Sequence, residues 1–376
     1  MSKIVIFIDW YKPAYKAGGP VISISNMVNL LNDEIDFYII TSNKDINEIN
    51  PLSNVDFNQW MGLNNTRVMY LDKQNQNIKN FKNLVNNISP DKIYLNGVFS
   101  WYFSILPLFL FRYKYQIIIS PRGMLGESAL KIKLFRKRVY LIIAKYFGLF
   151  KNVYWHASSK SEMKEIEMMF KIKKAITIIP NLTSIDNTNL KLNQKTIKSL
   201  RLISVCRLSP IKNIDFFLDV LSEIKFDCSY TLIGPDEDFS YKNKLIQKIN
   251  NLPDNIKISF YGPISPKKVK EKLLEADIFV SSSKNENYGH SIVEALSIGL
   301  PVLISNKNPW IELNEYRAGF RIPLDSNLFL EKLNYFEKLD NDEFMKYKSG
   351  AINYYNNLMN PYLYKKDYIK LLTNKS

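Results

Sequence analysis

Short runs of β-branched and aromatic residues recur along the first half of the chain, and segments with helical spacing separate them. The strand-like runs are residues 3–8, 36–41, 67–71, 92–95 and 116–120, and the helical segments include 21–31 and 78–87. Strands that alternate with helices in this way predict a parallel sheet covered by helices on both faces. We therefore expect residues 1–182 to form one Rossmann-like α/β domain.

A second series of the same kind begins after a polar stretch that is rich in Asn and Lys. Its predicted strands are residues 202–206, 229–233, 256–261, 277–281 and 301–304. The pattern predicts an α/β protein with two Rossmann-like parallel-sheet domains that face a cleft. Residues 183–199 would be a linker, 200–350 the second domain, and 351–376 a C-terminal helix that packs back on the first domain. Ligands of such sheets bind outside the carboxyl ends of the strands.

Composition and charge indicate the cellular environment and the kind of partner. The 376 residues are 46% hydrophobic, which is ample for two cores. Cys206 and Cys228 form no CxxC pair, so we expect a reduced, cytoplasmic protein without disulfides. The uncharged run 93–111 is broken by polar residues and Pro, which favours a strand and a buried helix over a membrane span. The net charge of +15 calls for an acidic partner, but no nucleic-acid-binding module is recognisable.

Two carboxylates stand out in residues 276–305, which read as a strand, a loop and a helix. Glu286 falls in the predicted loop, and Glu294 lies eight residues later in the helix that begins near Ser291. Backbone N–H groups of Gly289, His290 and Ser291 at the helix start suit a phosphate. The spacing alone leaves open that one acid is a solvated loop residue and the other a helix-surface residue.

Other candidates follow predicted strands. Arg207 and Lys212 could neutralise a departing diphosphate, although an Arg and a Lys five apart are often surface charge. Glycines after further strands would let the backbone approach a ligand, or would simply form turns. These positions are Gly18 and Gly19, Gly234, and Gly262 with its neighbour Tyr261.

The frame ENYGHSIVEALSIGLPVL closely resembles the Glu-x7-Glu signature of the retaining glycosyltransferases of family 4, which have the GT-B fold, and residues 203–221 are similar to that family's Arg-x4-Lys element. The resemblance implies that Glu286 contacts the transferred sugar and Glu294 holds the donor ribose. It implies that Arg207 and Lys212 clamp the diphosphate. Donor binding would also involve Gly18, Gly19, Gly234, Tyr261, Gly262, Gly289, His290 and Ser291.

The acceptor side rests on weaker likenesses. Residues 117–133 resemble an element of enzymes that make bacterial surface polysaccharides, with Arg122 where many members have His. Arg122 would bind an anionic acceptor group or pin its loop, and His156 would face the acceptor or pack in the core. The resemblance implies a nucleotide diphosphate sugar as donor, a lipid-linked saccharide as acceptor, and neither a cofactor nor a metal.

Residues 131–151 contain seven Lys or Arg, no acid, and large apolar side chains. This segment could lie on an anionic membrane surface, on the inner face of the plasma membrane, or be a core helix with a solvated basic face. Three rival functions remain open. They are a metal-dependent transferase that uses Asp236, Glu237 and Asp238, a sugar-nucleotide epimerase, and a basic membrane- or nucleic-acid-binding protein without activity.

Overall fold

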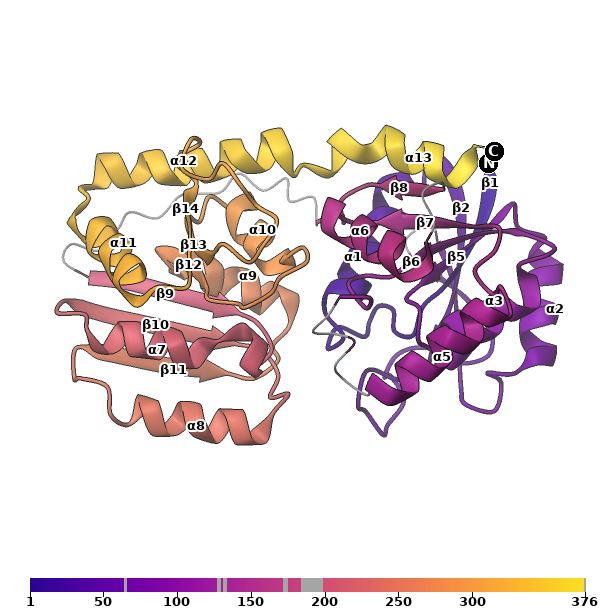
Figure 1. Cartoon of the computed structure of the whole chain (residues 1–376), viewed down its shortest axis with the longest axis horizontal. Helices are drawn as coiled ribbons and strands as arrows, with labels where there is room; N and C mark the ends of the chain where they lie inside the picture. The colour runs from indigo at the N-terminus through magenta and orange to yellow at the C-terminus, as the bar shows by residue number, and fades with distance from the viewer. Residues whose placement is uncertain (64–65, 127–129, 131–133, 172–174, 184–198, 375–376) are drawn as a thin grey trace. The chain divides into compact units, whose positions relative to one another are not determined.

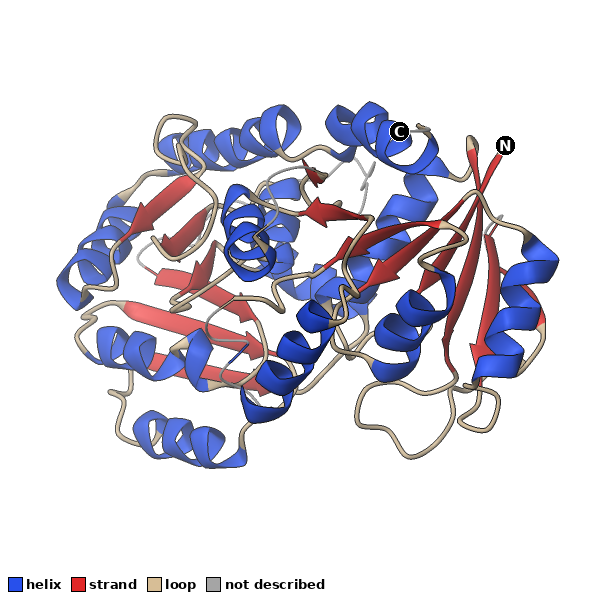
Figure 2. Cartoon of the chain, turned by 45° about the vertical axis from the view of Figure 1, so that its right-hand side comes forward, coloured by secondary structure: helices blue, strands red, loops and turns tan. Residues whose placement is uncertain are grey.

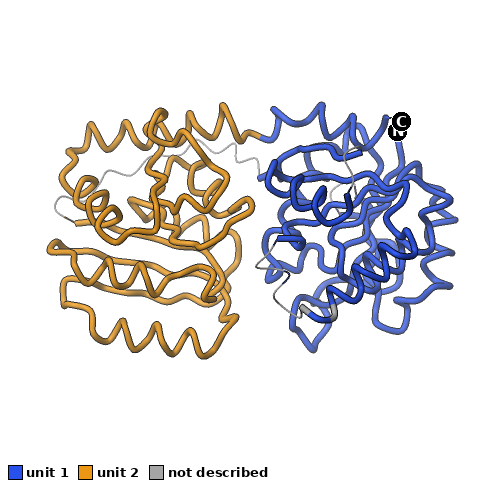
Figure 3. The backbone as a smooth tube through the Cα atoms, in the orientation of Figure 1, with its two compact units in different colours: residues 1–184, 361–376 blue, residues 185–360 orange. Residues whose placement is uncertain are grey.

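The computed structural model describes residues 1–63, 66–126, 130, 134–171, 175–183 and 199–374. The chain divides into two compact units, residues 1–184 with 361–376 and residues 185–360 (Figure 3). The predicted linker, 183–199, lies almost entirely outside the described residues.

The first unit is built on a mostly parallel sheet with the strand order β3-β4-β2-β1-β5-β6-β7-β8 (Figure 1). Only β3 runs antiparallel, at the edge of the sheet beside β4. The strands are β1 (Ser2–Phe7), β2 (Ile35–Ser42), β3 (Trp60–Leu63), β4 (Thr66–Leu71), β5 (Lys92–Asn96), β6 (Gln116–Ser120), β7 (Val153–Ala157) and β8 (Ile176–Ile178).

Helices pack against this sheet (Figure 2). The Phe7 ring on β1 contacts Phe81 at 5.3 Å and Phe111 at 6.3 Å, which fastens two helices to one face. The helical segments are α1 (Gly19–Leu31), α2 (Ile78–Ile88), η1 (Trp101–Ile105), α3 (Leu106–Phe111), α5 (Leu134–Tyr146), α6 (Lys160–Phe170), η3 (Pro361–Tyr364) and α13 (Lys365–Thr373).

The second unit has a sheet in which every pairing is parallel, in the order β11-β10-β9-β12-β13-β14. Its strands are β9 (Ser199–Val205), β10 (Asp227–Ile233), β11 (Ile256–Tyr261), β12 (Ile278–Ser281), β13 (Val302–Ser305) and β14 (Gly319–Ile322). Its helices are η2 (Pro210–Lys212), α7 (Ile214–Ser222), α8 (Phe239–Ile249), α9 (Pro266–Glu275), α10 (His290–Ser297), α11 (Ser326–Lys338) and α12 (Asn341–Leu358).

Each face of the second sheet carries its own core. Phe217 of α7 packs on Tyr230 of β10 and on Phe329 of α11, with ring centroids 5.1 and 6.1 Å apart. Ile292 of α10 and Ala351 of α12 belong to the apolar cluster on the opposite face. The two Rossmann-like parallel-sheet domains expected from the sequence are therefore present.

The chain end differs from the prediction. Residues 351–376 are not one helix, because residues 351–358 complete α12 of the second unit and α13 belongs to the first. The buried Lys92 ammonium donates to the carbonyl oxygens of Leu371 (3.0 Å) and Asn374 (2.7 Å) at the end of α13. A cation at a helix C-terminus satisfies carbonyl groups that have no partner within the helix.

No helix within the described ranges is long and apolar enough to cross a lipid bilayer. The uncharged run 93–111 forms the end of β5, η1 and α3 instead of one long helix.

Candidate active site

The second sheet reverses its strand order between β9 and β12, and this point places the candidate residues. From β9 the chain proceeds outward to β10 and β11, and then returns to build β12, β13 and β14 on the other side. Loops that leave the carboxyl ends of these two strands diverge and form a crevice. Lys212 follows β9 and Glu286 follows β12, so the fold brings them together across 74 residues of sequence.

A run of serines after β12 fastens the two loops to each other. The Ser282 hydroxyl is 3.2 Å from the Lys212 carbonyl and 3.0 Å from that of Asn213. The Ser283 hydroxyl is 3.2 Å from the Ile211 carbonyl. These bonds hold η2 on the loop that carries Glu286. The sequence prediction missed this role, although three consecutive serines at the end of a buried strand are a visible signal.

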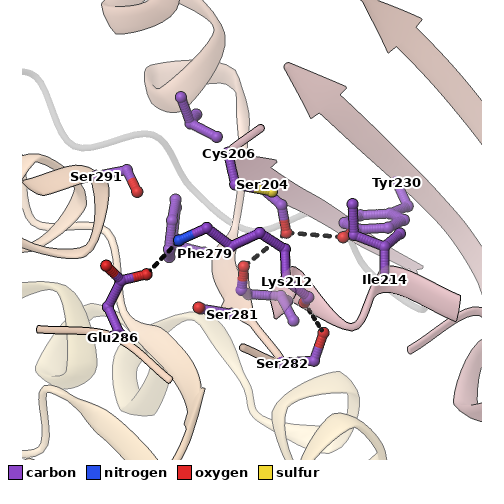
Figure 4. A pocket seen from close by; sticks show the side chains of 12 residues that line it. Ser204, Cys206, Lys212, Ile214, Tyr230, Phe279, Ser281, Ser282, Glu286 and Ser291 are labelled. Atoms are coloured by element: carbon purple, nitrogen blue, oxygen red, sulfur yellow. Dashed lines mark hydrogen bonds and ion pairs between the residues drawn. The ribbon is translucent and has the colours of Figure 1, made fainter. Parts of the chain in front are cut away.

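Lys212 and Glu286 form an ion pair with 2.5 Å between Nζ and Oε2, and their side chains are only 16% and 19% exposed (Figure 4). The pair lines a small pocket at the ends of β9 and β12. The pocket is lined by Ser204, Val205, Cys206, Ile214, Tyr230, Phe279, Val280, Ser281, Ser282 and Ser291 as well as by the pair itself. Burial raises the pKa of the Cys206 thiol to about 11, so this residue is a neutral wall.

Arg207 takes a different partner from the one that the clamp hypothesis gives it. Its guanidinium pairs with Glu237, and both side chains are exposed. Arg207 is therefore held at the surface in this structure, whereas Lys212 is held in the pocket.

The three acids considered for a metal site each have a bond of their own. Asp236 pairs with Lys242 at 2.5 Å, Glu237 pairs with Arg207, and the Asp238 carboxylate accepts the Tyr241 N–H at 2.9 Å as the cap of α8. A DxD-type metal site would have to break these contacts. Among the described residues, no group of three or more His, Cys, Asp or Glu side chains is arranged to hold a metal ion.

The amino terminus of α10 presents backbone donors beside Glu286. Gly289, at φ 75°, is the N-cap and supplies no capping side chain. A Cβ at Gly289 would lie 2.8 Å from Ile292 Cδ1 and 3.1 Å from Glu286 Cγ, so a glycine is needed for this approach. In the part of the chain that the structure describes, no carbonyl accepts the N–H of Gly289 or Ser291. Such donors suit an anionic group.

Glu294 lies one turn into α10 and is half-buried. Burial raises the pKa of this carboxyl to about 7. Within the described ranges no Lys or Arg pairs with it, so its oxygens can accept hydrogen bonds from a ligand. His290 stacks obliquely on Tyr288, with ring centroids 4.7 Å apart, at the same end of α10.

The glycines after β10 and β11 differ from each other. Gly234 has φ 146°, and a Cβ there would lie 2.0 Å from the Cys206 carbonyl oxygen. Its glycine is required by the chain itself, which removes the need to invoke a ligand. Gly262 has open space around it, and the adjoining Tyr261 ring is about one-third exposed, below the Lys272 ammonium at 5.4 Å. Gly262 and Tyr261 therefore remain accessible candidates.

In the first unit, Gly18 caps α1 at φ 67° with open space around it, and Gly19 is the first residue of the helix. The preceding loop is held by the buried Asp45, whose carboxylate accepts the N–H groups of Tyr15 (3.0 Å) and Lys16 (3.1 Å). The glycine loop thus has a defined conformation.

Arg122 is engaged within its own unit. Its guanidinium donates to Asn96 Oδ1 at 2.8 Å and to the Tyr94 hydroxyl at 3.0 Å, and it also bonds Asn181. Of the two roles proposed for this residue, these bonds favour pinning the loop, which Arg122 holds to β5 and to the segment before the second unit.

His156 cannot contact an acceptor in this structure. The ring is fully buried, with Nδ1 2.6 Å from the Tyr94 hydroxyl and Nε2 2.8 Å from the Ile179 carbonyl. Burial, with a smaller effect of the Arg122 charge, lowers its pKa to about 3, so the imidazole is neutral. Of the two roles given to His156, these contacts favour packing in the core, because both ring nitrogens have partners there.

Known protein sequences resemble the segment that carries this site. Residues 187–346 match the family model described as glycosyl transferases group 1. The match lies in the second unit and covers most of it. The matched segment contains the Lys212–Glu286 pair, Arg207 and α10.

Curated relatives match only part of the chain. The alpha-monoglucosyldiacylglycerol synthase of Streptococcus pneumoniae is 28% identical over 156 residues, which is 38% of this chain and 35% of that protein. The chain therefore spans about a third of the length of this relative.

Solved structures show the same fold over the whole chain. Sucrose-phosphate synthase from Thermosynechococcus elongatus superposes with a TM-score of 0.75 at 17% identity, covering 99% of this chain and 98% of that one. Anabaena HepE, solved in complex with UDP and glucose, superposes with a TM-score of 0.70 at 16% identity and full coverage of both chains. The two units thus have the two-domain GT-B fold.

Proposed function

We propose that the protein is a retaining, metal-independent glycosyltransferase that moves a sugar from a nucleotide diphosphate sugar to an acceptor hydroxyl. The observation that carries the proposal is the match of residues 187–346 to the group 1 family, and Lys212, Glu286 and Glu294 all lie within that segment. The UDP and glucose bound to Anabaena HepE support a nucleotide sugar as donor.

The donor would bind along the loops after β9 and β12. Lys212 and the free N–H groups of Gly289 and Ser291 would hold the diphosphate, and Arg207 would leave Glu237 to join them. Glu294 would accept the ribose hydroxyls, for which its unpaired carboxyl is suited. Glu286, released from Lys212 by the diphosphate, would accept hydroxyls of the transferred sugar.

The chemical step needs stabilisation of negative charge on the departing phosphate. The bond between the anomeric carbon and the phosphate oxygen breaks, and the acceptor oxygen bonds to the same face of that carbon. The acceptor proton passes to the phosphate oxygen that leaves, so nucleoside diphosphate and product form without a protein base. Lys212, Arg207 and the α10 amino terminus would supply the positive potential in which this charge develops.

For the acceptor, we propose a lipid-linked saccharide of surface polysaccharide assembly such as O-antigen or capsule. The likeness of residues 117–133 to enzymes of that kind supports this choice. So does the name of the Streptococcus pneumoniae relative, a synthase of a glucosylated diacylglycerol.

Attachment to an anionic membrane surface through residues 131–151 completes the proposal. The described helix of this segment, α5, buries Leu141 and Ala144 and exposes an outer stripe of Phe135, Val139, Ile142 and Tyr146. The spacing of 4, 3 and 4 residues puts these four side chains on one face of the helix. Exposed Arg138 and Lys145 flank the stripe. Apolar side chains rimmed by cations suit a surface of anionic lipid. Residues 131–133 lie outside the described residues.

The function is tested with a panel of nucleotide sugars. We expect the true donor to raise the melting temperature of the purified protein, because it binds only the folded state. With that donor and lipid extracts, product anomers read by NMR should retain the donor configuration, and excess EDTA should leave the rate unchanged. An inverted product would contradict the mechanism, and the absence of any stabilising donor would contradict the function.

Glu286 provides the sharpest single variant. We expect Glu286→Gln to lower kcat by about 10²- to 10³-fold, as for the loss of one transition-state contact, while donor stabilisation persists. The matched control is Glu331→Gln, an exposed acid on α11 in the same unit. Unchanged transfer by Glu286→Gln would remove this residue from the site.

A further inference from the structure

The first unit has a strand-order reversal of its own, between β1 and β5. The chain runs outward from β1 through β2 to β4 and then returns to add β5, β6 and β7 on the other side. The crevice for a ligand of this sheet therefore lies outside the carboxyl ends of β1 and β5. Asp9 follows β1 there, and Ser100 and Trp101 follow β5.

Asp9 and Ser100 are joined across this reversal. The Ser100 hydroxyl donates to Asp9 Oδ1 at 2.6 Å. Ser100 Oγ also accepts the Phe103 N–H at 3.2 Å and so caps η1. The serine proton is thus directed at the carboxylate. The Asp9 carbonyl accepts the Ser42 N–H at 3.2 Å, which fixes the backbone on the other side.

The Asp9 carboxylate has acceptor capacity to spare. It accepts hydrogen bonds from the Ser100 hydroxyl and from its own N–H, whereas a carboxylate has about four lone-pair sites. No Lys or Arg in the described ranges forms an ion pair with it, and burial raises its pKa. A half-buried carboxylate without a cation is complemented by neutral hydroxyl donors better than by an anion.

Trp101, the residue after Ser100, is 60% exposed at the start of η1. Trp101 thus follows directly in the chain the residue that bonds the Asp9 carboxylate. An exposed aromatic ring and a carboxylate are the two groups that bind a pyranose. The apolar face of the sugar packs on the ring, and a pair of its hydroxyls donates to the acid. His156 is buried and Arg122 is bonded within its own unit, so neither offers a comparable surface for a sugar.

We propose that Asp9, Ser100 and Trp101 form a subsite for a neutral saccharide, the sugar portion of the acceptor. This inference rests on the proposed sugar transfer for its purpose, but the binding it requires is measurable without any transfer. Asp9 accepts two neighbouring sugar hydroxyls, Ser100 orients the carboxylate, and Trp101 covers one face of the ring.

Saturation-transfer NMR on the full chain tests this with methyl glucopyranoside, methyl galactopyranoside and N-acetylglucosamine as probes. We expect ring-proton signals from at least one probe with the wild type, and a loss of about five-fold or more with Asp9→Asn and with Trp101→Ala. Asp36→Asn, an exposed acid on β2, and Tyr113→Ala, an exposed aromatic side chain, are the matched controls and should bind like the wild type.

No signal from any probe with the wild type would overturn the subsite, as would equal signals from Asp9→Asn and Trp101→Ala. If Asp9→Asn fails to fold, Ser100→Ala replaces it, because removal of this hydroxyl leaves the carboxylate in place but unoriented. Nucleoside diphosphate binding is measured on the same samples. Failure of that binding alone refutes the proposed transfer, whereas its persistence with lost saccharide binding supports the subsite as a separate element.

Discussion

Lys212 and Glu286 neutralise each other in the absence of a donor, and this has a consequence for binding. Both side chains are mostly buried, so a diphosphate that attracts Lys212 leaves the Glu286 carboxylate in need of new donors. Hydroxyls of the donor sugar would supply them. The pair would thus couple recognition of the phosphate to recognition of the sugar. A nucleoside diphosphate without its sugar would bind with the Glu286 carboxylate left without hydrogen-bond donors.

Glu294 makes donor binding depend on pH. Burial raises its pKa to about 7, and the ionised form is the better acceptor for two ribose hydroxyls. Since the ionised fraction rises about tenfold between pH 6 and pH 8, we expect the affinity for nucleoside diphosphate to rise by about the same factor. Titration calorimetry at several pH values measures this, and Glu294→Gln should give a flat profile. A flat wild-type profile would contradict the assignment.

The same shift affects stability with the opposite sign. The folded state holds the Glu294 proton more tightly than the unfolded chain, so the stability from this group is full below the ordinary value of 4.5 and is lost as the pH rises through about 7. Glu294→Gln should therefore melt above the wild type at pH 8, and the gap should narrow toward pH 5.

Gly234 and Gly262 form a matched pair for separating structure from ligand contact. Alanine at Gly234 needs φ 146° and would collide with the Cys206 carbonyl, so we expect a loss of about 3 kcal/mol in the free energy of unfolding. Alanine at Gly262 meets nothing within 4 Å and should leave stability unchanged. Urea unfolding measures both. A lower nucleotide affinity in Gly262→Ala alone would place the base against that loop.

At the scale of elements, hydrophobic runs predicted the buried parallel strands well. β6 and β11 have the predicted bounds. The bounds of the other predicted strands differ from the observed ones by up to three residues at an end, because caps and fraying determine where an element ends. Four strands, β3, β7, β8 and β14, were missed. The three or four residues of β3, β8 and β14 carry little pattern, and these segments are strands only because a neighbour offers a free edge.

Spacing also located most of the candidate site but not its contacts. The positions of Glu286 and Glu294 around the start of α10 followed from the strand-loop-helix pattern. The pairing of Lys212 with Glu286, and of Arg207 with Glu237, depends on tertiary structure that no local pattern encodes. The burial of His156 depends likewise on α13, since Tyr368 packs its ring 5.2 Å from the imidazole.

Helix α5 carries the prediction that concerns membranes. Replacing Phe135 and Ile142 by Glu should abolish sedimentation with phosphatidylglycerol vesicles, because both side chains belong to the exposed stripe. Replacing Arg138 and Lys145 by Glu should weaken binding by about 30-fold or more at low salt, given about 1 kcal/mol per basic residue. The control is Phe239→Glu on α8, an equally exposed ring in the second unit. Unchanged sedimentation of the Phe135 and Ile142 variant would refute attachment through α5.

At the scale of the whole molecule, two similar series of strands predicted two domains, and the structure contains two units. The sequence did not reveal that α12 and α13 belong to different units, since both have ordinary helical spacing. What assigns α13 is a set of distant partners. Lys365 pairs with Glu34 at 2.9 Å, and the Tyr368 hydroxyl donates to the Pro180 carbonyl at 2.9 Å.

The hydrogen bonds from Lys92 to the end of α13 determine the order in which the two units can finish folding during synthesis. Residues 1–184 leave the ribosome before the second unit, but their unit lacks α13 until residues 361–376 are made, whereas the second unit is whole by residue 360. We expect a fragment of residues 1–184 to aggregate or bind chaperones, with Lys92 lacking its carbonyl partners, and a peptide of residues 361–376 added in trans to restore a cooperative melting transition. The domain that is translated first would thus be the one that matures last.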